Sequence, residues 1–322
     1  MTTAEILSAL PRLSALVVGD ICLDRWCRYD PALGEPSRET GIPRTAVVEV
    51  EVTPGAGGTV ANNLAALGVG RIAVLGAFGE DGHAAELSRA LDQRGIACDL
   101  CVRSARLQTF TYTKLINRVT GIEDQPRIDF INTVPIPNEV ERQILARLRQ
   151  AVETFDVILI ADQAETDQGG VVTPAVRELL ANLASNHPEK IFWADSRARI
   201  AHFRHVILKP NQQEAEAACS GDYSTWRRRA GAPVLMVTHG GAGVLVVDES
   251  SERWVKAKAV ERPVDICGAG DSFSAGAAMA LHITRSPLAA AHFGNLVASV
   301  TVMKPGTGTA SPEEILAAEH AQ

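Results

Sequence analysis

The sequence lacks the features that mark exported, membrane-bound and nucleic-acid-binding proteins. No apolar run reaches the length of a membrane-spanning helix, and residues 1–18 have neither a cationic start nor a small-residue cleavage site. The formal net charge is −7, from 38 acidic and 31 basic residues, which opposes non-specific binding to nucleic acid. We therefore expect a cytoplasmic protein that binds neither a membrane nor a nucleic acid.

Cysteine and histidine are too scattered to predict a metal site. Of the six cysteines, only Cys98 and Cys101 form a C-x-x-C pair, and no second pair or neighbouring histidine accompanies them. The eight histidines contain no H-E-x-x-H pattern. Reduced thiols and scattered histidines are the simpler interpretation, and a zinc site is disfavoured.

Three common signatures of nucleotide sites and nucleophiles are also missing. No G-x-x-x-x-G-K-[ST] segment occurs, which excludes a P-loop, and no complete G-x-G-x-x-G follows the first strand. A G-x-S-x-G nucleophile elbow is absent too.

Short apolar strands alternate with helical patterns along most of the chain. Strands are predicted at residues 15–18, 72–75, 157–160, 191–193, 206–208 and 234–237, and helices at 60–67, 84–94, 139–153, 174–185 and 212–218. This alternation predicts an α/β domain over residues 1–322, with a mostly parallel sheet covered by helices on both faces. Ligands of such sheets bind at the carboxyl ends of the strands.

Three segments depart from this alternation. Residues 44–52, 109–117 and 127–131 alternate between apolar and polar side chains without helices between them, which is typical of half-buried antiparallel strands. We expect a small β-sheet, formed by about residues 36–53 and 107–132, that is inserted in the main domain and covers the site as a lid. Because so small a sheet cannot bury its own faces, pairing of two lids in a homodimer is predicted.

The run Gly268, Ala269, Gly270 and Asp271 leads into a strongly apolar helical segment. Glycine backbone at a helix start can approach a phosphate closely, and the unpaired N–H groups favour an anion there. A carboxylate in that position would repel the phosphate unless it serves another purpose, such as accepting a proton from an attacking hydroxyl. Phosphoryl transfer is therefore the first hypothesis, and an ordinary turn with a capping aspartate is the alternative.

Five short motifs follow one another along the chain, at residues 19–24, 54–68, 209–214, 238–243 and 268–271. In this order they resemble the ribokinase-like (PfkB) carbohydrate kinase family over almost the whole chain. Four shorter segments, 19–25, 37–39, 113–115 and 127–130, are most similar to the heptose-7-phosphate kinases of ADP-heptose synthesis. The resemblance implies a ribokinase-like three-layer α/β fold with a β-sheet lid.

The resemblance also implies an ATP-dependent phosphotransferase that acts on a hydroxyl of a sugar or sugar phosphate. Asp271 would be the base, and the backbone of Gly268, Ala269 and Gly270 would stabilise the transferring phosphoryl group. The residues implied to bind the substrate are Asp24, Gly55, Gly57, Gly58, Thr59, Asn63, Lys114 and Arg127. The last two would bind a phosphate already present on the substrate, and solvated strand charges are the alternative for them.

Two positions depart from the family pattern. Thr59 stands where the family usually has a sugar-binding asparagine, and Ala56 replaces the second glycine of the usual pair. A hydroxyl offers fewer separate donors and acceptors than an amide, so sugar recognition at Thr59 must differ.

The implied cofactors are ATP and Mg²⁺. The matching nucleotide-binding residues are Asn211, Glu214, Thr238, Gly240, Gly243 and Asn295. Glu214 would hold magnesium through water, and a helix cap is a compatible role for the same residues. In some members of the family a potassium ion lies beside the anion hole, and the matching positions here are Asp265, Cys267, Thr301, Lys304 and Gly306.

Two other functions stay open at this point. One is a kinase of another small ring such as a nucleoside, although an aromatic content of 5% gives little support for a stacked base. The other is a catalytically silent sugar-binding protein on the same fold, since a fold does not dictate a function.

Overall fold

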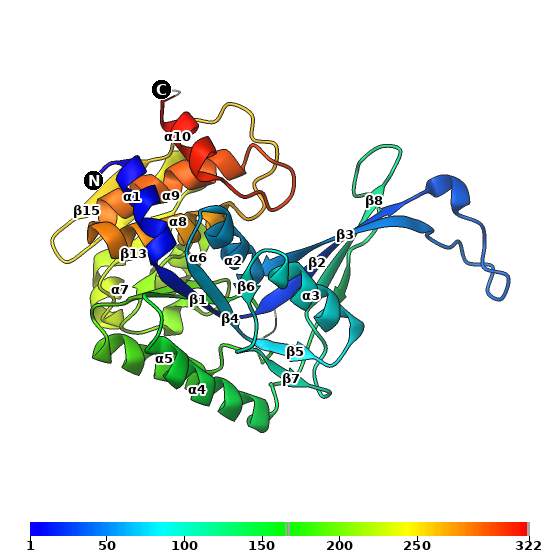
Figure 1. Cartoon of the computed structure of the whole chain (residues 1–322), viewed down its shortest axis with the longest axis horizontal. Coiled ribbons are helices and arrows are strands. Elements are labelled where there is room, and N and C mark those ends of the chain that lie inside the picture. Colours follow the sequence, from blue (N-terminus) through cyan, green and yellow to red (C-terminus); the bar gives the residue numbers. More distant parts are fainter. Residues whose placement is uncertain (165, 167, 321–322) are drawn as a thin grey trace.

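The computed structural model describes residues 1–164, 166 and 168–320, and its centre is a nine-stranded sheet (Figure 1). The strand order is β15-β14-β13-β12-β11-β10-β1-β4-β6, parallel throughout except for the antiparallel edge strands β14 and β15. The strands are β1 Ser14–Gly19, β4 Arg71–Leu75, β6 Ile96–Ala97, β10 Val157–Asp162, β11 Ile191–Ser196, β12 Ile207–Leu208, β13 Leu235–Thr238, β14 Gly243–Val247 and β15 Glu252–Lys256. All six predicted strands are present in this sheet.

Helices cover both faces of the sheet, as predicted, and make a three-layer structure. Successive residues of β1 point to opposite faces, so Ala15 and Val17 join one buried cluster while Leu16 and Val18 join the other. The first face is covered by α1 Thr3–Ala9, α2 Gly57–Ala66, α3 Gly82–Asp92, α8 Ala269–Thr284, α9 Pro287–Thr301 and α10 Pro312–His320. The second is covered by α4 Asn138–Val152, α5 Pro174–Asn186, α6 Gln212–Cys219 and α7 Tyr223–Ala230.

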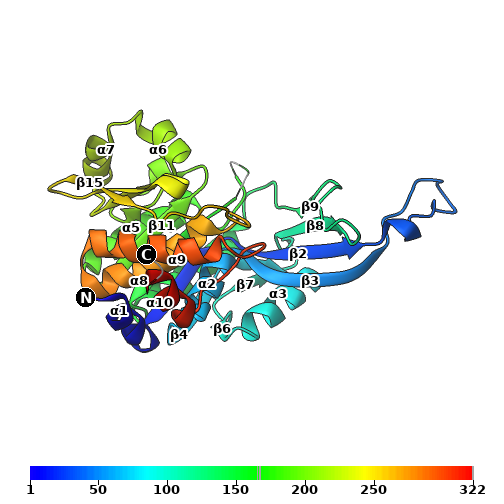
Figure 2. The ribbon, with the colours of Figure 1, turned by 90° about the horizontal axis from the view of Figure 1, so that it is seen from above.

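A separate four-stranded sheet forms the lid, in the order β3-β2-β8-β9. Its strands are β2 Ile21–Tyr29, β3 Val47–Ala56, β8 Thr111–Asn117 and β9 Ile128–Phe130. The β2–β3 ribbon extends well beyond the body of the molecule (Figure 2). The lid differs from the expected all-antiparallel sheet, because β2 and β8 pair in parallel and β2, outside the predicted lid segments, is a central strand.

Smaller elements complete the fold. Strands β5 Ala77–Gly79 and β7 Val102–Ser104 pair with each other, and short 3₁₀ turns lie at Leu10–Arg12, Pro31–Leu33, Ile200–His202 and Gly240–Ala242. Within the described residues, no helix has both the length and the apolar character needed to cross a membrane.

Candidate active site

The glycine run forms the N-terminus of α8, at the carboxyl edge of the sheet. Gly268 is the N-cap residue, with φ 76° in the left-handed region, and its carbonyl accepts the N–H of Ser272 at 2.9 Å. Ala269, Gly270 and Asp271 occupy the first turn, where backbone N–H groups have no partner within the helix; the N–H of Ala269 donates to the Ile266 carbonyl at 3.2 Å. The anion site inferred from the sequence therefore has the expected local geometry, with a carboxylate in the same turn.

Asp271 lies in a cluster of charged side chains. Burial raises the pKa of its carboxyl to about 7, Asp195 adds to the rise, and Lys209 opposes it. Lys209 Nζ contacts Asp195 Oδ2 at 2.6 Å, and only 4% of the lysine side chain is exposed. A Cβ built on Gly270 would lie 3.2 Å from that Nζ. The ammonium group therefore lies next to Gly270, where it adds positive charge to the anion site.

Burial by itself would lower the pKa of Lys209, but the charge and hydrogen bond of Asp195, with further contributions from Glu214 and Asp271, raise it instead. Ser274 also donates a hydrogen bond to Asp195, at 3.4 Å. The lysine is therefore held in its charged form by the carboxylates around it.

Two threonine methyl groups enclose Gly268. A Cβ on Gly268 would lie 3.3 Å from Cγ2 of Thr59 and 3.3 Å from Cγ2 of Thr307. Thr59 is buried, and its hydroxyl donates to the Pro54 carbonyl at 3.4 Å. Asn63, one turn further along α2, is fully buried and donates to the Thr59 carbonyl at 2.9 Å. Both side chains are therefore buried, and the Thr59 methyl group packs against Gly268 at the start of α8.

Asp24 lies on the lid strand β2, beside Gly55. A Cβ on Gly55 would come within 2.5 to 2.7 Å of the Asp24 carboxylate, so a side chain there would displace that carboxylate. Burial raises the pKa of Asp24 to about 6, while Lys114 and Arg127 lower it. Asp24 also contributes to the raised pKa of Asp271, which places the two carboxyl groups within electrostatic reach of each other.

The neighbouring glycines support close packing at the start of α2. The N–H of Gly57 donates to the Asp20 carbonyl at 2.9 Å. A Cβ on Gly58 would lie 2.6 Å from Cβ of Pro54. Ala56, at the position of the missing family glycine, has φ 52° and ψ −121°, a conformation unfavourable for an L-residue.

The lid cations each have partners. Lys114 Nζ lies 4.3 Å from the centroid of the Trp26 ring and 4.0 Å from Glu123. Arg127 donates two hydrogen bonds to Asp129, at 2.8 and 2.7 Å. A substrate phosphate would therefore have to compete with nearby groups for both cations.

The residues matched to the nucleotide site lie along neighbouring strand ends. Asn211 and Glu214 form a capping box at the start of α6, with bonds of 2.9 and 2.7 Å. Burial raises the pKa of Glu214, and Asp195 contributes to the rise. Thr238 forms a parallel bridge with Asn211, and its N–H donates a hydrogen bond to the Pro210 carbonyl at 3.0 Å.

Two glycines and one asparagine complete this set. Gly240 and Gly243 have φ of 55° and 120°, and a Cβ on Gly243 would lie 2.2 Å from the Val255 carbonyl oxygen. Asn295, on α9, donates to the carbonyls of Val255 and Lys256 at 3.3 and 3.2 Å.

Two of the residues matched to a potassium site, Cys267 and Gly306, contact Asp265. Its two carboxylate oxygens accept the N–H groups of Cys267 and Gly306, at 2.9 and 3.0 Å. Thr301 shares a 2.8 Å hydrogen bond with Ser272. The Lys304 ammonium group is bound to Glu314, at 2.7 Å, so its charge is compensated there.

Comparison with known proteins identifies the family. The model of the pfkB family of carbohydrate kinases matches residues 14–314. The chain belongs to this family. Two curated relatives are bifunctional proteins HldE, from Pelobacter propionicus, 30% identical over 97% of this chain, and from Trichlorobacter lovleyi, 31% identical over 95%. The chain spans only 64% and 62% of the lengths of these two proteins.

Solved structures confirm the ribokinase-like fold of this pfkB family member. Ribokinase from Thermotoga maritima superposes with a TM-score of 0.67 at 21% identity, covering 95% of this chain and 99% of that one. Phosphofructokinase-2 from Escherichia coli, crystallised with potassium, gives 0.71 at 18% identity, covering 95% and 97%. Arabidopsis thaliana ribokinase, in complex with ribose and ATP, gives 0.69 at 16% identity, covering 96% and 99%.

Sequence reasoning missed several side chains that the fold brings to this site. The motif at residues 209–214 assigns no role to Lys209, and no sequence motif points to Asp195 or Trp26. A charged residue at the end of an apolar strand was a usable signal for Asp195, because strand ends meet at the ligand edge. The contact of Lys209 with Gly270, 61 residues apart in the chain, is not readable from local sequence.

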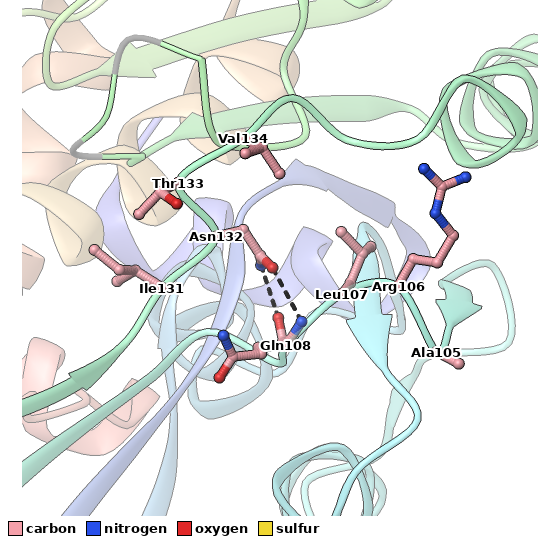
Figure 3. Close-up of a pocket in the computed structure, with 8 residues that line it drawn as sticks. All are labelled: Ala105, Arg106, Leu107, Gln108, Ile131, Asn132, Thr133 and Val134. Carbon is pink, nitrogen blue, oxygen red and sulfur yellow. Dashed lines mark hydrogen bonds between the residues drawn. The ribbon is translucent and has the colours of Figure 1, made fainter.

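The pocket drawn in Figure 3, of about 240 Å³, lies apart from these residues. It lies between two connecting segments, 105–108 and 131–134, and none of the predicted site residues lines it. Asn132 joins the two segments by bonding both the N–H and the carbonyl of Gln108, at 3.0 and 2.8 Å. Among its lining residues, Arg106 carries a charge, which is paired with Glu139.

Proposed function

We propose that this pfkB family member transfers the γ-phosphoryl group of ATP to a hydroxyl of a sugar or sugar phosphate, with a heptose 7-phosphate as the first substrate to test. The observation that supports this best is the placement of Asp271 in the first turn of α8, beside Gly268 and within electrostatic reach of Asp24. A base, an anion site and a sugar-binding carboxylate are thereby combined.

In the proposed reaction, Asp271 accepts the proton of the acceptor hydroxyl as its oxygen attacks the γ-phosphorus. The bond from the γ-phosphorus to the bridging oxygen breaks, and ADP leaves with the electron pair. The backbone N–H groups after Gly268 and the Lys209 ammonium stabilise the negative charge on the transferring group. With a pKa of about 7, Asp271 is a suitable proton acceptor near neutral pH.

Magnesium fits the acidic side of this site. Glu214 and Asp195 are hard oxygen donors, Asp195 is close enough to raise the pKa of Glu214, and a divalent cation would offset that rise. Asn211 and Glu214 would hold the ion through water, and bound magnesium would neutralise charge on the nucleotide phosphates.

The experiment is an ADP-release screen over neutral sugars, sugar 6- and 7-phosphates and nucleosides. For a sugar phosphate, Lys114→Ala or Arg127→Ala should raise KM by roughly ten- to a hundredfold, because each charge-assisted contact contributes about 1.5 to 3 kcal/mol. Arg106→Ala is the matched control, since its exposed pair with Glu139 lies outside the site. If neutral sugars are the better substrates and neither lid variant changes their kinetics, the heptose-phosphate assignment is wrong.

The same screen tests the alternatives. Turnover only with nucleosides would replace the sugar acceptor by another ring. ADP release that is absent with every acceptor, despite nucleotide binding, would favour a catalytically silent binding protein.

We further propose that a potassium ion binds beside Asp265, at the backbone of Cys267, Thr301, Lys304 and Gly306. The two bonds that Asp265 accepts, from the N–H groups of Cys267 and Gly306, support the assignment, because they hold the two segments that would supply the backbone ligands at one carboxylate. Equal turnover in sodium, potassium and a bulky organic cation would refute it.

A homodimer formed through the lids is also proposed, in a cytoplasmic enzyme. Val47, Val48 and Val50 on β3 are 42%, 47% and 46% exposed, an apolar strip that a second lid could cover. Sedimentation at micromolar concentration should show a dimer, which Val48→Lys combined with Val50→Lys should dissociate. A monomer in the parent protein would contradict this assembly, and cell fractionation tests the location.

A further inference from the structure

Trp26 lies on β2, the central strand of the lid, and contacts two functional regions. On one side it meets Lys114, whose Nζ is 4.3 Å from the ring centroid. On another side, a Cβ built on Gly306 would lie 3.3 Å from Cζ2 and 3.5 Å from Cη2 of the indole. Gly306 has φ 66°, in the left-handed region. The indole therefore packs against the bare backbone of a residue in the core domain.

Gly306 belongs to a loop that supports the glycine turn of the proposed anion site. Its N–H donates to Asp265 at 3.0 Å, and the other oxygen of Asp265 accepts the N–H of Cys267 at 2.9 Å. The next residue, Thr307, places its methyl group 3.3 Å from a Cβ built on Gly268. A displacement of Gly306 would therefore affect the position of Gly268 in two ways. One is through the Asp265 carboxylate, which binds both loop segments, and the other is through the packing of the Thr307 methyl group.

Lys114 connects the acceptor side to the same assembly. Burial raises the pKa of the Asp24 carboxyl, and the Lys114 ammonium opposes the rise. The ammonium therefore lies within electrostatic reach of the sugar-binding side, and its contact with the indole connects it to Gly306. An anionic acceptor that binds Lys114 would compete with the indole for it.

We propose that Trp26 is a positioning residue that couples occupancy of the lid to the geometry of the anion site at Gly268. The inference rests on the proposed function, because it needs an acceptor under the lid and a phosphoryl group on α8. Acceptor binding changes the contact of Lys114 with the indole, the indole changes its packing on Gly306, and Asp265 and Thr307 transmit the change. When water enters the site without an acceptor, the contacts of Trp26 do not change, and the geometry of the anion site does not change either. This favours phosphoryl transfer to the sugar over hydrolysis of ATP.

Because coupling between two ligands is reciprocal, it can be measured without turnover. Calorimetry would give the affinity of adenylyl imidodiphosphate with magnesium, with and without saturating heptose 7-phosphate. In the parent protein we expect the acceptor to tighten nucleotide binding by roughly fivefold or more. In Trp26→Leu the factor should fall to within about twofold of 1, and Trp26→Phe should retain part of it.

Trp226→Phe is the matched control, since Trp226 lies on α7, in the buried cluster on the other face of the sheet from α8, and makes no contact with Gly306 among the described interactions. It should keep the parent coupling factor. A purely structural role for Trp26 would lower the melting temperature in its variants but leave the coupling factor unchanged. Parent-like coupling in Trp26→Leu overturns the proposal, as does a parent protein that binds both ligands without coupling.

Fluorescence provides a test that does not depend on the acceptor. The emission difference between the parent and Trp26→Phe should change when adenylyl imidodiphosphate binds, and stay constant with AMP, which cannot fill the anion site. If no sugar binds at all, the proposed substrate is wrong, and this measurement still decides the role of Trp26. An emission difference that does not change when adenylyl imidodiphosphate binds overturns the proposed role of Trp26.

Discussion

Lys209→Met tests whether the buried ammonium group organises the active site. The change keeps much of the side-chain volume but leaves Asp195 without its partner at 2.6 Å. Because Lys209 is 4% exposed and the Asp195 side chain 12%, the remaining carboxylate would be poorly solvated. Breaking such a buried pair costs about 3 to 5 kcal/mol of unfolding free energy. The matched control is Arg106→Met, which breaks an exposed pair and should cost less than about 1 kcal/mol.

The same change should move the pH dependence of turnover. Lys209 lowers the pKa of Asp271 and Asp195 raises it, against a value of about 7 in the parent. Lys209→Met should therefore shift the acid limb of kcat/KM to higher pH, and Asp195→Asn should shift it to lower pH.

The double variant, Lys209→Met with Asp195→Asn, removes both charges and should recover most of the lost stability. Denaturant unfolding and pH–rate profiles of the four proteins give both quantities. If Lys209→Met loses less than about 1 kcal/mol and leaves the acid limb in place, the proposed role of the buried pair is refuted.

Three further predictions concern other positions. Asp271→Asn should raise the melting temperature of the nucleotide-free protein at pH 8. The pKa of the Asp271 carboxyl is about 7 in the folded protein and 3.8 for an unperturbed aspartate, so its ionisation destabilises the folded state. The gain in melting temperature should shrink as the pH falls toward 4, and a gain that is constant with pH would contradict the prediction. Gly268→Ala, at φ 76° between two threonine methyl groups, should lower turnover by roughly tenfold or more in an ADP-release assay, and parent-like turnover would show that the turn tolerates a side chain. Ala56→Gly should stabilise the protein by about 1 kcal/mol in denaturant unfolding because it relieves an unfavourable φ of 52°, whereas Ala85→Gly, at an exposed position inside α3, should destabilise it by about the same amount.

Much of the main sheet could be predicted because its strands are buried on both faces and read as continuous apolar runs. The strands that were missed lacked that signal. β6 has two residues, too few for any periodicity. β14 begins at Gly243, the last residue of the glycine-rich motif 238–243, which resembles a nucleotide-binding loop and does not indicate a strand. β2 was missed because its first three residues are all buried, which hides the alternation of a lid strand.

Two helices that the apolar pattern did not predict have a local signal of a helix N-terminus in the sequence. Thr2 and Glu5 form a capping box at α1, and Ser286 followed by Pro287 begins α9. Both signals are local and need no tertiary information.

The site residues that could be predicted are those whose geometry depends on neighbours in the sequence, and those that could not depend on contacts between distant segments. Gly268 and Asp271 share one helix start, so their geometry follows from adjacent residues. The contacts of Lys209 with Asp195, and of Trp26 with Gly306, join segments far apart in the chain. Neither partner in these pairs constrains the local sequence of the other, so the pairing becomes visible only when the fold is known.

The most direct test of the central claim is acceptor-dependent ADP release by the parent protein and by Asp271→Asn, with nucleotide binding measured in parallel. Asparagine keeps the size and helix position of Asp271 but cannot accept the proton of the acceptor hydroxyl. We expect sugar- or sugar-phosphate-dependent turnover in the parent, a fall of roughly a hundredfold or more in the variant, and similar nucleotide affinity in both. Unchanged turnover in Asp271→Asn, with an acceptor present, would contradict the account.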